Sequence, residues 1–452
     1  MVQLTSESKD ENKCVFERPF VECTDNLEKF TKEGDNYMKQ FANLYTKRLE
    51  ELSAILKDRV KAKWGKDVNL IPLADLEEQN GKRCAIIGTL YKHQPNKPSI
   101  LQELSEEHQM SLPTPKPDYC SDDDQLFLED QTSRVRLSGD KVNVKESVTG
   151  VVCAVLGSEN QKSLFEVEDW CFPGCPLQKP LPKNSANVGK MVFVSGLELA
   201  STPQNLALNL FTEWLCGLNG DASYQEDEAS IVRVVIAGNS IKGCANIHVS
   251  KGLVSGRAED ATSARETTLG TQRLDTLLET IGTNCCVTLM PGQFDVTMLM
   301  MPQSSMHPGS FPKARRLTSV KGVTNPWVGK ISDRIITGTS GQPIQDIQKV
   351  CGHDTLEPLD WLERTLEWRH PCPTAPDTIS CLPFYKSDPF ILKECPNIYF
   401  VGNMEKFATK MFKGEEGQQV RLICIPKFST TQTAVLVDLE TMDAKPISFG
   451  SG

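Results

Sequence analysis

The chain has 452 residues, of which 39% are hydrophobic and 24% are charged. This length is sufficient for two or three domains with well-packed cores, and the composition is typical of a globular protein. The net charge of −10 excludes a chain that binds DNA strongly over its whole surface, because phosphate contacts need clustered Lys and Arg. We interpret one local basic strip, Lys57–Lys66, as the solvated face of a helix in preference to a nucleic-acid contact.

The ends and the cysteines indicate an intracellular protein. No apolar run approaches the ~18–20 residues that span a bilayer, and Met1–Asn12 is too polar and acidic for a signal or transit peptide. Sixteen cysteines scattered along such a chain predict reduced thiols in the cytosol or nucleus. The close pairs Cys171/Cys175 and Cys285/Cys286 lack the second pair or the histidines of a zinc site, so we interpret them as buried free thiols.

A polar arm, residues 1–35, precedes a strongly periodic helix. Asp35 is the expected N-cap, and Gly65 is the expected stop after the helix. Apolar residues recur between them at steps of three and four, which predicts one buried face: Tyr37, Met38, Phe41, Leu44, Tyr45, Leu49, Leu52, Ile55, Leu56 and Val60. Together with the strands that follow, this helix is assigned to a domain of residues 36–180.

The rest of that domain predicts a small all-β barrel. Five short β runs are separated by turn residues, which is typical of an OB-fold: Arg83–Tyr91, Gln125–Glu129, Arg134–Leu137, Val148–Leu156 and Ser163–Trp170. The segment His93–Asp124 is rich in proline and acids and is interpreted as a long insertion. OB-folds commonly bind single strands through aromatics and a basic groove. Here Tyr91, Phe127 and Phe165 have acids beside them, so a structural barrel is preferred.

After a predicted linker, Pro176–Val188, strands alternate with helices. This alternation predicts a layered α/β/β/α domain over residues 181–452. Expected strands are Met191–Val194, Ile231–Ala237, Cys286–Met290, Arg334–Thr337, Asn397–Val401, Arg421–Ile425 and Ala434–Leu439. Two helix faces are expected from Leu206, Leu210, Phe211, Trp214 and Leu218, and from Leu274, Leu277, Leu278 and Ile281.

Five glycine-bearing turns directly follow β runs in this second domain. They are Ser195–Glu198, Gly238–Ser240, Pro291–Asp295, Thr339–Gln342 and Gly402–Glu405. In layered α/β sheets, ligands bind on loops at the carboxyl ends of strands. The five turns therefore have the arrangement of a metal site, although their side chains are unusual for one.

The order of these turns resembles the calcineurin-type metallophosphoesterases, whose motifs are D-x-H, G-D, G-N-H-(D/E), an isolated His and G-H-x-H. A closer resemblance is to the small (B) subunits of replicative DNA polymerases, in particular those of eukaryotic polymerase delta. It covers nearly the whole chain, more weakly in the barrel, and rests on these strings: VVIAGN (Val234–Asn239), MPGQFD (Met290–Asp295), TNPW (Thr324–Trp327), GTSGQ (Gly338–Gln342), RHPCPTAPDT (Arg369–Thr378), CLPFYKSDPF (Cys381–Phe390), CPNIYFVGN (Cys395–Asn403) and FSTTQTAVLVDL (Phe428–Leu439).

The resemblance also implies where the phosphoesterase ligands have been lost. In motif order, the metal-site positions fall at Gly196, Glu198, Asn239, Gln293, Phe294, Ser340, Asn403 and Glu405, and none holds the expected residue. Two divalent ions need several anionic oxygens and imidazoles, whereas Glu198 and Glu405 could at most hold one hard ion weakly. We therefore expect no catalytic residue, no metal and no cofactor. His370 is interpreted as a structural histidine.

The function that the resemblance implies is that of a non-catalytic accessory subunit. In the family, an OB-fold fused to an inactive phosphoesterase-like domain is a platform in the nucleus. It binds the cysteine-rich C-terminal domain of the catalytic subunit and links it to a third, elongated subunit. A small fourth subunit and, indirectly, the sliding clamp are further expected partners, with little or no direct DNA contact and no membrane contact.

Two alternatives from other classes stay open. One is a residual phosphodiesterase or 3′ exonuclease that uses Glu198, Asn239 and Glu405. The other is a single-strand-binding OB protein that acts through residues 36–180.

Overall fold

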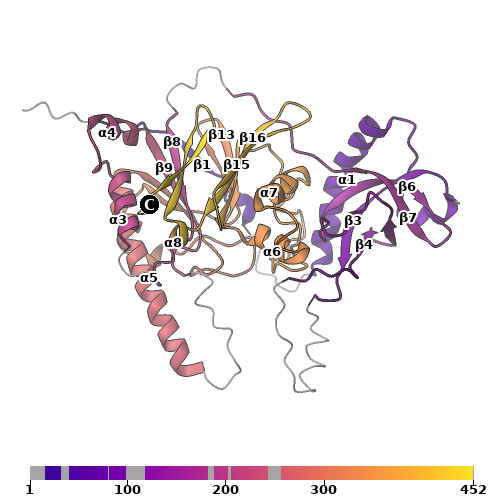
Figure 1. Ribbon diagram of the computed structural model, residues 1–452, viewed down its shortest axis with the longest axis horizontal. Coiled ribbons are helices and arrows are strands. Elements are labelled where there is room, and N and C mark those ends of the chain that lie inside the picture. Colours follow the sequence, from indigo (N-terminus) through magenta and orange to yellow (C-terminus); the bar gives the residue numbers. More distant parts are fainter. Residues whose placement is uncertain are drawn as a thin grey trace, which may run out of the picture.

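The computed structural model describes residues 16–31, 40–79, 81–97, 118–181, 188–201, 205–242 and 256–450. Figure 1 shows two units side by side along the longest axis, with a small β unit at one end and a larger layered unit at the other. Among the residues described, no helix has both the length and the apolar character needed to cross a bilayer.

The small unit is the predicted OB-fold. Its strands are β2 (Leu70–Ile71), β3 (Cys84–His93), β4 (Gln125–Glu129), β5 (Arg134–Ser138), β6 (Val152–Glu159) and β7 (Leu164–Cys171). The pairings run β3–β4–β5–β7–β6 and return to β3, with only β5–β7 parallel in this ring. Each expected run is a strand, although β6 begins at Val152 and not at Val148. Alternate apolar side chains fill the interior, which is why the period of two identified these strands.

Helix α1 (Ala42–Trp64) covers one side of the barrel. Its face of Leu52, Leu56 and Val60 packs on apolar side chains of β3 and β6. Gly65 ends the helix at φ +94°, as predicted. The helix begins at Ala42, and Phe41, expected on the buried face, is its 40% exposed N-cap. Asp35, the expected cap, lies outside the described residues.

The larger unit contains two six-stranded sheets, which confirms the layered architecture. The β9 sheet has the order β11-β10-β9-β8-β17-β18, and the β14 sheet has the order β1-β12-β13-β14-β16-β15. The strands of the β9 sheet are β8 (Lys190–Val194), β9 (Ile231–Ala237), β10 (Cys286–Met290), β11 (Val320–Gly322), β17 (Thr433–Asp438) and β18 (Ala444–Ser448). Those of the β14 sheet are β1 (Cys23–Asp25), β12 (Trp327–Ile331), β13 (Arg334–Thr339), β14 (Ile398–Met404), β15 (Ala408–Lys413) and β16 (Gln419–Pro426).

The two sheets pack face to face through a core that includes Phe193, Trp327 and Phe400. Helices α3 (Leu206–Leu215) and α5 (Gly256–Asn284) cover the outer face of the β9 sheet. Helices α6 (Gln342–Cys351) and α7 (Pro358–Glu367) cover the outer face of the β14 sheet and lie between it and the barrel. The short helices α4 (Ala222–Ala229) and α8 (Phe428–Thr431) complete the unit.

The expected face of α3 needs correction. Leu206 is 72% exposed, and Leu218, 71% exposed, lies beyond the end of the helix at Leu215. Phe211 and Leu215 are the buried residues. A helix of ten residues offers fewer than three turns, so its apolar period defines its ends poorly.

The N-terminal arm packs on the layered unit. Strand β1 belongs to this arm and pairs antiparallel with β12. The Arg18 guanidinium donates to the carbonyl oxygens of Glu228 (2.8 Å) and Ile231 (2.7 Å), at and just past the end of α4. A cation at these carbonyls complements the negative end of the helix dipole. The domain boundaries at residues 35 and 180 stay a proposal, and the arm shares a sheet with the layered unit.

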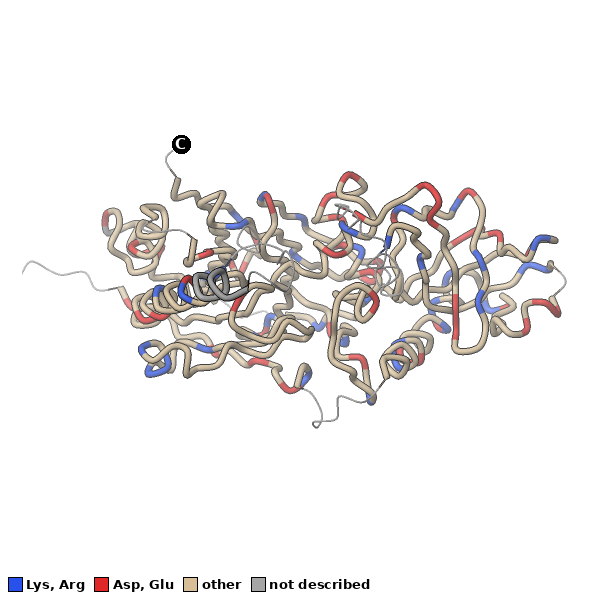
Figure 2. Tube along the Cα trace, turned by 90° about the horizontal axis from the view of Figure 1, so that it is seen from below, with Lys and Arg blue, Asp and Glu red and all other residues tan. Residues whose placement is uncertain are grey.

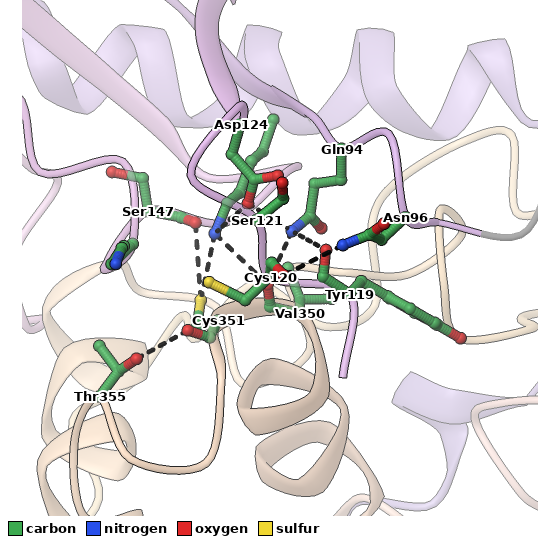
Figure 3. A network of polar contacts seen from close by, with 12 residues as sticks. Gln94, Asn96, Tyr119, Cys120, Ser121, Asp124, Ser147, Val350, Cys351 and Thr355 are labelled. Atoms are coloured by element: carbon green, nitrogen blue, oxygen red, sulfur yellow. Dashed lines mark hydrogen bonds and ion pairs between the residues drawn. The ribbon is translucent and has the colours of Figure 1, made fainter. Parts of the chain in front are cut away.

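A polar network joins the barrel to the end of α6 (Figure 3). The carbonyl oxygen of Val350, in the last turn of α6, accepts from Gln94 Nε2 at 2.9 Å and from Lys92 Nζ at 3.3 Å. Lys92 and Asp124 are both buried and lie 3.8 Å apart. Gln94 Nε2 also donates to Asp124 at 2.8 Å. The buried cation is therefore placed where the helix dipole is negative and is balanced by one carboxylate.

Arg48 of α1 makes the second connection between the units. Its Nε donates to Asp388 Oδ2 at 2.7 Å, and neither side chain is exposed to solvent. Its other nitrogens donate to carbonyl oxygens of both units: Gly150 (3.1 Å), Pro373 (2.9 Å) and Ala375 (2.7 Å). The strings RHPCPTAPDT and CLPFYKSDPF thus supply most of the groups that receive one buried guanidinium.

His370 completes this cluster as a neutral structural histidine. Its Nδ1 accepts from the backbone N–H of Cys372 at 3.3 Å, so Nε2 carries the proton and donates to Asp388 Oδ2 at 3.0 Å. Burial, with a further contribution from Arg48, lowers the pKa of His370 from 6.5 to about 4. The neutral imidazole is therefore the form that the fold requires.

Stability should consequently fall between about pH 6.5 and pH 4. In that window the unfolded chain binds a proton at His370 that the folded chain excludes, so folding loses roughly 3 kcal/mol in total on acidification. Urea unfolding at several pH values checks this. His370→Gln should show a flatter profile from a lower stability at pH 7, whereas His353→Gln, at an exposed site, should keep the original profile. Equal acid sensitivity of the unmodified chain and of His370→Gln would contradict the assignment.

Candidate functional site

The five glycine-bearing turns meet at one edge of the layered unit. Hydrogen bonds join them directly: Gly196 N–H donates to Gly238 O at 2.9 Å, and Ser340 Oγ donates to Pro291 O at 2.6 Å. Asn403 Nδ2 donates to Ala237 O (3.1 Å) and to Ser340 O (2.7 Å). The meeting follows from topology, because β8–β9, β9–β10 and β13–β14 are parallel pairs whose carboxyl ends lie together.

The backbone at these turns is in the left-handed region. The φ angles are +63° at Gly196, +48° at Glu198, +53° at Asn239 and +59° at Asn403. Asparagine tolerates this conformation better than most residues, whereas a glutamate in it is uncommon. Gly238 has φ +80°, and a Cβ there would lie 2.5 Å from Ser340 Oγ. The backbone therefore turns sharply at all these positions.

A pocket of about 850 Å³ opens beside the turns and is lined by five of the eight proposed former ligand positions. These five are Asn239, Gln293, Phe294, Asn403 and Glu405. Gly196, Glu198 and Ser340 are absent from its lining, so the two glutamates that could have shared one ion do not face this pocket together. Its remaining charged residues are Asp354 and Glu357 of the α6–α7 connection, Asp360 in the first turn of α7, and two lysines, Lys406 and Lys427.

Several polar groups at the former ligand positions hydrogen-bond within the protein, whereas Asn403 Oδ1 is buried without a hydrogen-bond partner. Asn239 Oδ1 accepts from Phe294 N–H at 3.3 Å, and the Asn403 amide donates to two backbone carbonyls. Behind them lies a neutral cluster in which Asn325 Nδ2 donates to Gln303 Oε1 at 2.8 Å and to Gln342 Oε1 at 3.0 Å. The side-chain amides of this cluster therefore satisfy each other without a metal.

Asp295 is a buried carboxylate that the sequence interpretation did not single out. It accepts from the backbone N–H groups of Ile241 and Gly292, each at 2.8 Å. Burial raises the pKa of Asp295, and backbone N–H donors oppose that effect. It connects the turn after β9 to the turn after β10, and its position as the last residue of the turn Pro291–Asp295 was the available signal.

The donor set does not fit the two-metal centre of an active phosphoesterase. Such a centre needs carboxylates and imidazoles converging on both ions, and here amides, a hydroxyl and a phenyl ring stand at most of those positions. Within the described ranges, no three or more His, Cys, Asp or Glu side chains form a group that could hold a metal ion.

Comparison with known proteins matches both units. A family model described as the DNA polymerase delta subunit OB-fold domain matches residues 40–170, and a model for the B-type subunit of DNA polymerases alpha/epsilon matches residues 191–409. DNA polymerase delta subunit 2 of Drosophila melanogaster is 39% identical over 422 residues, which cover 93% of this chain and 95% of the relative. The delta small subunits of Oryza sativa (36% identical, covering 96% and 99%) and Saccharomyces cerevisiae (28%, covering 92% and 90%) are also similar.

The chain belongs to the family of DNA polymerase delta small subunits.

In this member of the family, the barrel face is poorly suited to stacking bases. Phe165 is fully buried inside the barrel, which rules out one of the three aromatic side chains considered for nucleic-acid contact. The rings of Tyr91 and Phe127 lie 6.3 Å apart, and Arg134 covers Tyr91 with its Cζ 4.4 Å from the ring centroid. Arg134 is itself paired with Glu129 at 2.6 Å.

Charge is mixed over the whole subunit. Figure 2 shows Lys and Arg interspersed with Asp and Glu along the traced chain of both units. A single-strand groove needs a continuous basic track, and such a track is not evident in the described residues.

The cysteines agree with reduced thiols. All fourteen in the described part of the chain are free, and ten of them are buried. Cys171 and Cys175, the close pair, are 4% and 8% exposed. Burial raises the pKa of most of these thiols, for example Cys351 to about 12, so most of them are protonated at neutral pH. Cys395 differs, because its pKa is lowered.

Proposed function

We propose that this chain is a non-catalytic platform in the nuclear DNA polymerase delta complex. It binds the cysteine-rich C-terminal domain of the catalytic subunit and connects it to the third, elongated subunit and through that to a small fourth subunit and the sliding clamp. Polymerase chemistry belongs to the catalytic subunit. Gly196, Glu198, Asn239, Gln293, Phe294, Ser340, Asn403 and Glu405 are proposed as the positions of a lost metal site.

One observation supports the part of this proposal that assigns no catalytic activity to the chain. Where a phosphoesterase would hold two cations, Asn403, Asn239 and Ser340 hydrogen-bond the neighbouring turns. The turns themselves keep the architecture in place. Polar groups at this site therefore connect neighbouring turns, which is a structural role.

The rigid joint between the units supports the same proposal. One apolar cluster runs from the barrel interior through α6 and α7 to the β14 sheet.

Next to the pocket, the loop after β10 exposes Val296 (46%) and Leu299 (73%). Apolar side chains grouped on a fixed surface are typical of a partner-binding site, and we assign this loop to a subunit contact.

Recovery of the complex tests the platform role. Tagged chain expressed in nuclei should co-purify with the catalytic and third subunits, and Val296→Asp with Leu299→Asp should lower the yield of at least one of them about tenfold. Leu218→Asp, 71% exposed near the end of α3, is the matched control and should leave the yield unchanged. Recovery of the unmodified chain as a lone monomer would overturn the platform proposal.

The residual phosphodiesterase is tested separately. The purified chain with Mn²⁺ and a generic phosphodiester should give turnover equal to the blank, and Glu198→Ala, Asn239→Ala and Glu405→Ala should not change it. Turnover that any of these three substitutions abolishes would establish an enzyme. Salt-dependent binding of a single-stranded oligonucleotide by the whole chain would favour the OB alternative.

A further inference from the structure

Two thiols from different units lie in contact. Cys175 follows β7, where the chain leaves the barrel, and Cys395 directly precedes the turn into β14. Their sulfur atoms are 3.3 Å apart and share a hydrogen bond. Disulfide sulfurs are ~2.05 Å apart, so an approach of about 1.2 Å would bring these two to bonding distance.

The backbone around Cys175 is anchored, which keeps the pair in register. Gly174 N–H donates to Glu367 O at 2.8 Å, and Gln418 Nε2 donates to Cys175 O at 3.3 Å. Neither hydrogen bond involves a sulfur atom. The position of Cys175 is therefore fixed by hydrogen bonds that do not depend on the state of its thiol.

A pocket opens beside Cys175, one member of the pair, whereas Cys395 is only 2% exposed. Cys175 lines a pocket of about 440 Å³ together with Arg59, Lys63 and Cys171. The hydrogen bond from Cys175 lowers the pKa of Cys395, burial opposes this, and the Arg369 guanidinium lowers it further. The hydrogen bond to Cys395 and burial raise the pKa of Cys175, so Cys395 is the thiolate that the pair favours. Thiolates are the forms that react.

We propose that Cys175 and Cys395 are a peroxide-sensitive dithiol that closes into a disulfide between the two units. The thiolate sulfur attacks one oxygen of hydrogen peroxide, the O–O bond breaks, and hydroxide leaves, which gives a sulfenic acid. The second thiol gives its proton to that hydroxide, and its sulfur displaces hydroxide from the sulfenic sulfur. That hydroxide takes up the proton released at the start, so two thiols and one peroxide yield one disulfide and two waters.

The disulfide would fasten the end of the barrel to the β14 sheet. The two cysteines are separated by 220 positions in the chain, so the bond would close a long loop of the unfolded chain and raise stability. Reduction by a thiol would reverse it. Disulfides of intracellular proteins are commonly transient in this way.

Peptide mass analysis tests the proposal on the full-length chain. After hydrogen peroxide treatment and thiol blocking, digestion without reductant should release one cross-linked species that contains Cys175 and Cys395. Dithiothreitol should split it, and the oxidised chain should unfold at a higher temperature. Cys175→Ser and Cys395→Ser should each abolish the species, and Cys171→Ser, in the same pocket, should keep it.

Two results would overturn it. One is that Cys175 and Cys395 remain unoxidised at peroxide levels that modify the half-exposed Cys216 and Cys286. The other is that Cys175 pairs with Cys171 and not with Cys395. Both are read from masses, so they are independent of whether the chain recovers its polymerase partners.

Discussion

Arg48→Ala should lower the free energy of unfolding by about 3–5 kcal/mol, because it leaves the Asp388 carboxylate buried without its cation. The arginine also donates to three backbone carbonyls, and these would become unsatisfied buried acceptors. Its pair holds the pKa of Asp388 well below the usual range, against the effect of burial. Chemical denaturation at pH 7, where this carboxylate is ionised in both states, measures the loss.

The control is the neighbouring residue on the same helix. Lys47 forms an exposed pair with Glu50 at 2.6 Å, with side chains 38% and 51% exposed. Lys47→Ala should therefore change stability by less than about 1 kcal/mol.

A double substitution separates charge from packing at Arg48. Combining Arg48→Met with Asp388→Asn removes both charges. The double mutant should therefore lose less unfolding free energy than Arg48→Ala alone. If Arg48→Ala were as mild as Lys47→Ala, the guanidinium would not be joining the units.

Phe400→Ala should cost about 3–5 kcal/mol, since it opens a cavity between the two sheets. Phe400 is fully buried, and its ring centroid lies 5.0 Å from that of Phe193 and 6.3 Å from that of Trp327. In the sheet register Gly338 stands between Trp327 and Phe400. The absence of a side chain at Gly338 leaves room for the rings.

The close packing of Gly338 against Phe400 predicts the direction in which the two substitutions affect each other. A Cβ at Gly338 would lie 2.4 Å from the Phe400 ring, so Gly338→Ala alone should cost about 1–3 kcal/mol by overpacking. In the double mutant Gly338→Ala/Phe400→Ala, the new methyl group enters the space that the ring vacated. The loss of unfolding free energy should therefore be smaller than the sum of the two single losses.

Urea unfolding of the two single mutants and the double mutant measures this coupling. Phe41→Ala, at a 40% exposed ring, should be nearly neutral. Additive losses would mean that Gly338 and Phe400 do not share this space.

Elements with strong local patterns could be predicted from the sequence. Cys286–Met290 coincides with β10 because a fully buried parallel strand is a continuous apolar run between turns. Strand β1 could not be predicted, since its three residues are a strand only because β12 lies beside them. Helix α6 was not predicted: it has only ten residues, and over so short a length an apolar period is weak evidence for a helix.

The candidate site was predictable in position and less so in detail. Turns after parallel strands must gather at one sheet edge, which placed Asn239, Ser340 and Asn403 together. The neutral cluster of Gln303, Asn325 and Gln342 depends on side-chain directions across two sheets. No local pattern in the sequence encodes such a contact, so this cluster behind the former ligand positions could not be predicted.

The order of strands in the β9 sheet limits when this protein can fold. Strand β8 lies between β9 and β17, and β17 ends at Asp438, close to the end of the described chain. Strand β1, near the start, likewise waits for β12, about 300 residues later. During synthesis the layered unit therefore has an open sheet edge at β8 until β17 has been made and has emerged from the ribosome, and such edges favour aggregation. Chaperone protection of the nascent chain should matter more for this unit than for the barrel, whose strands are complete by residue 171.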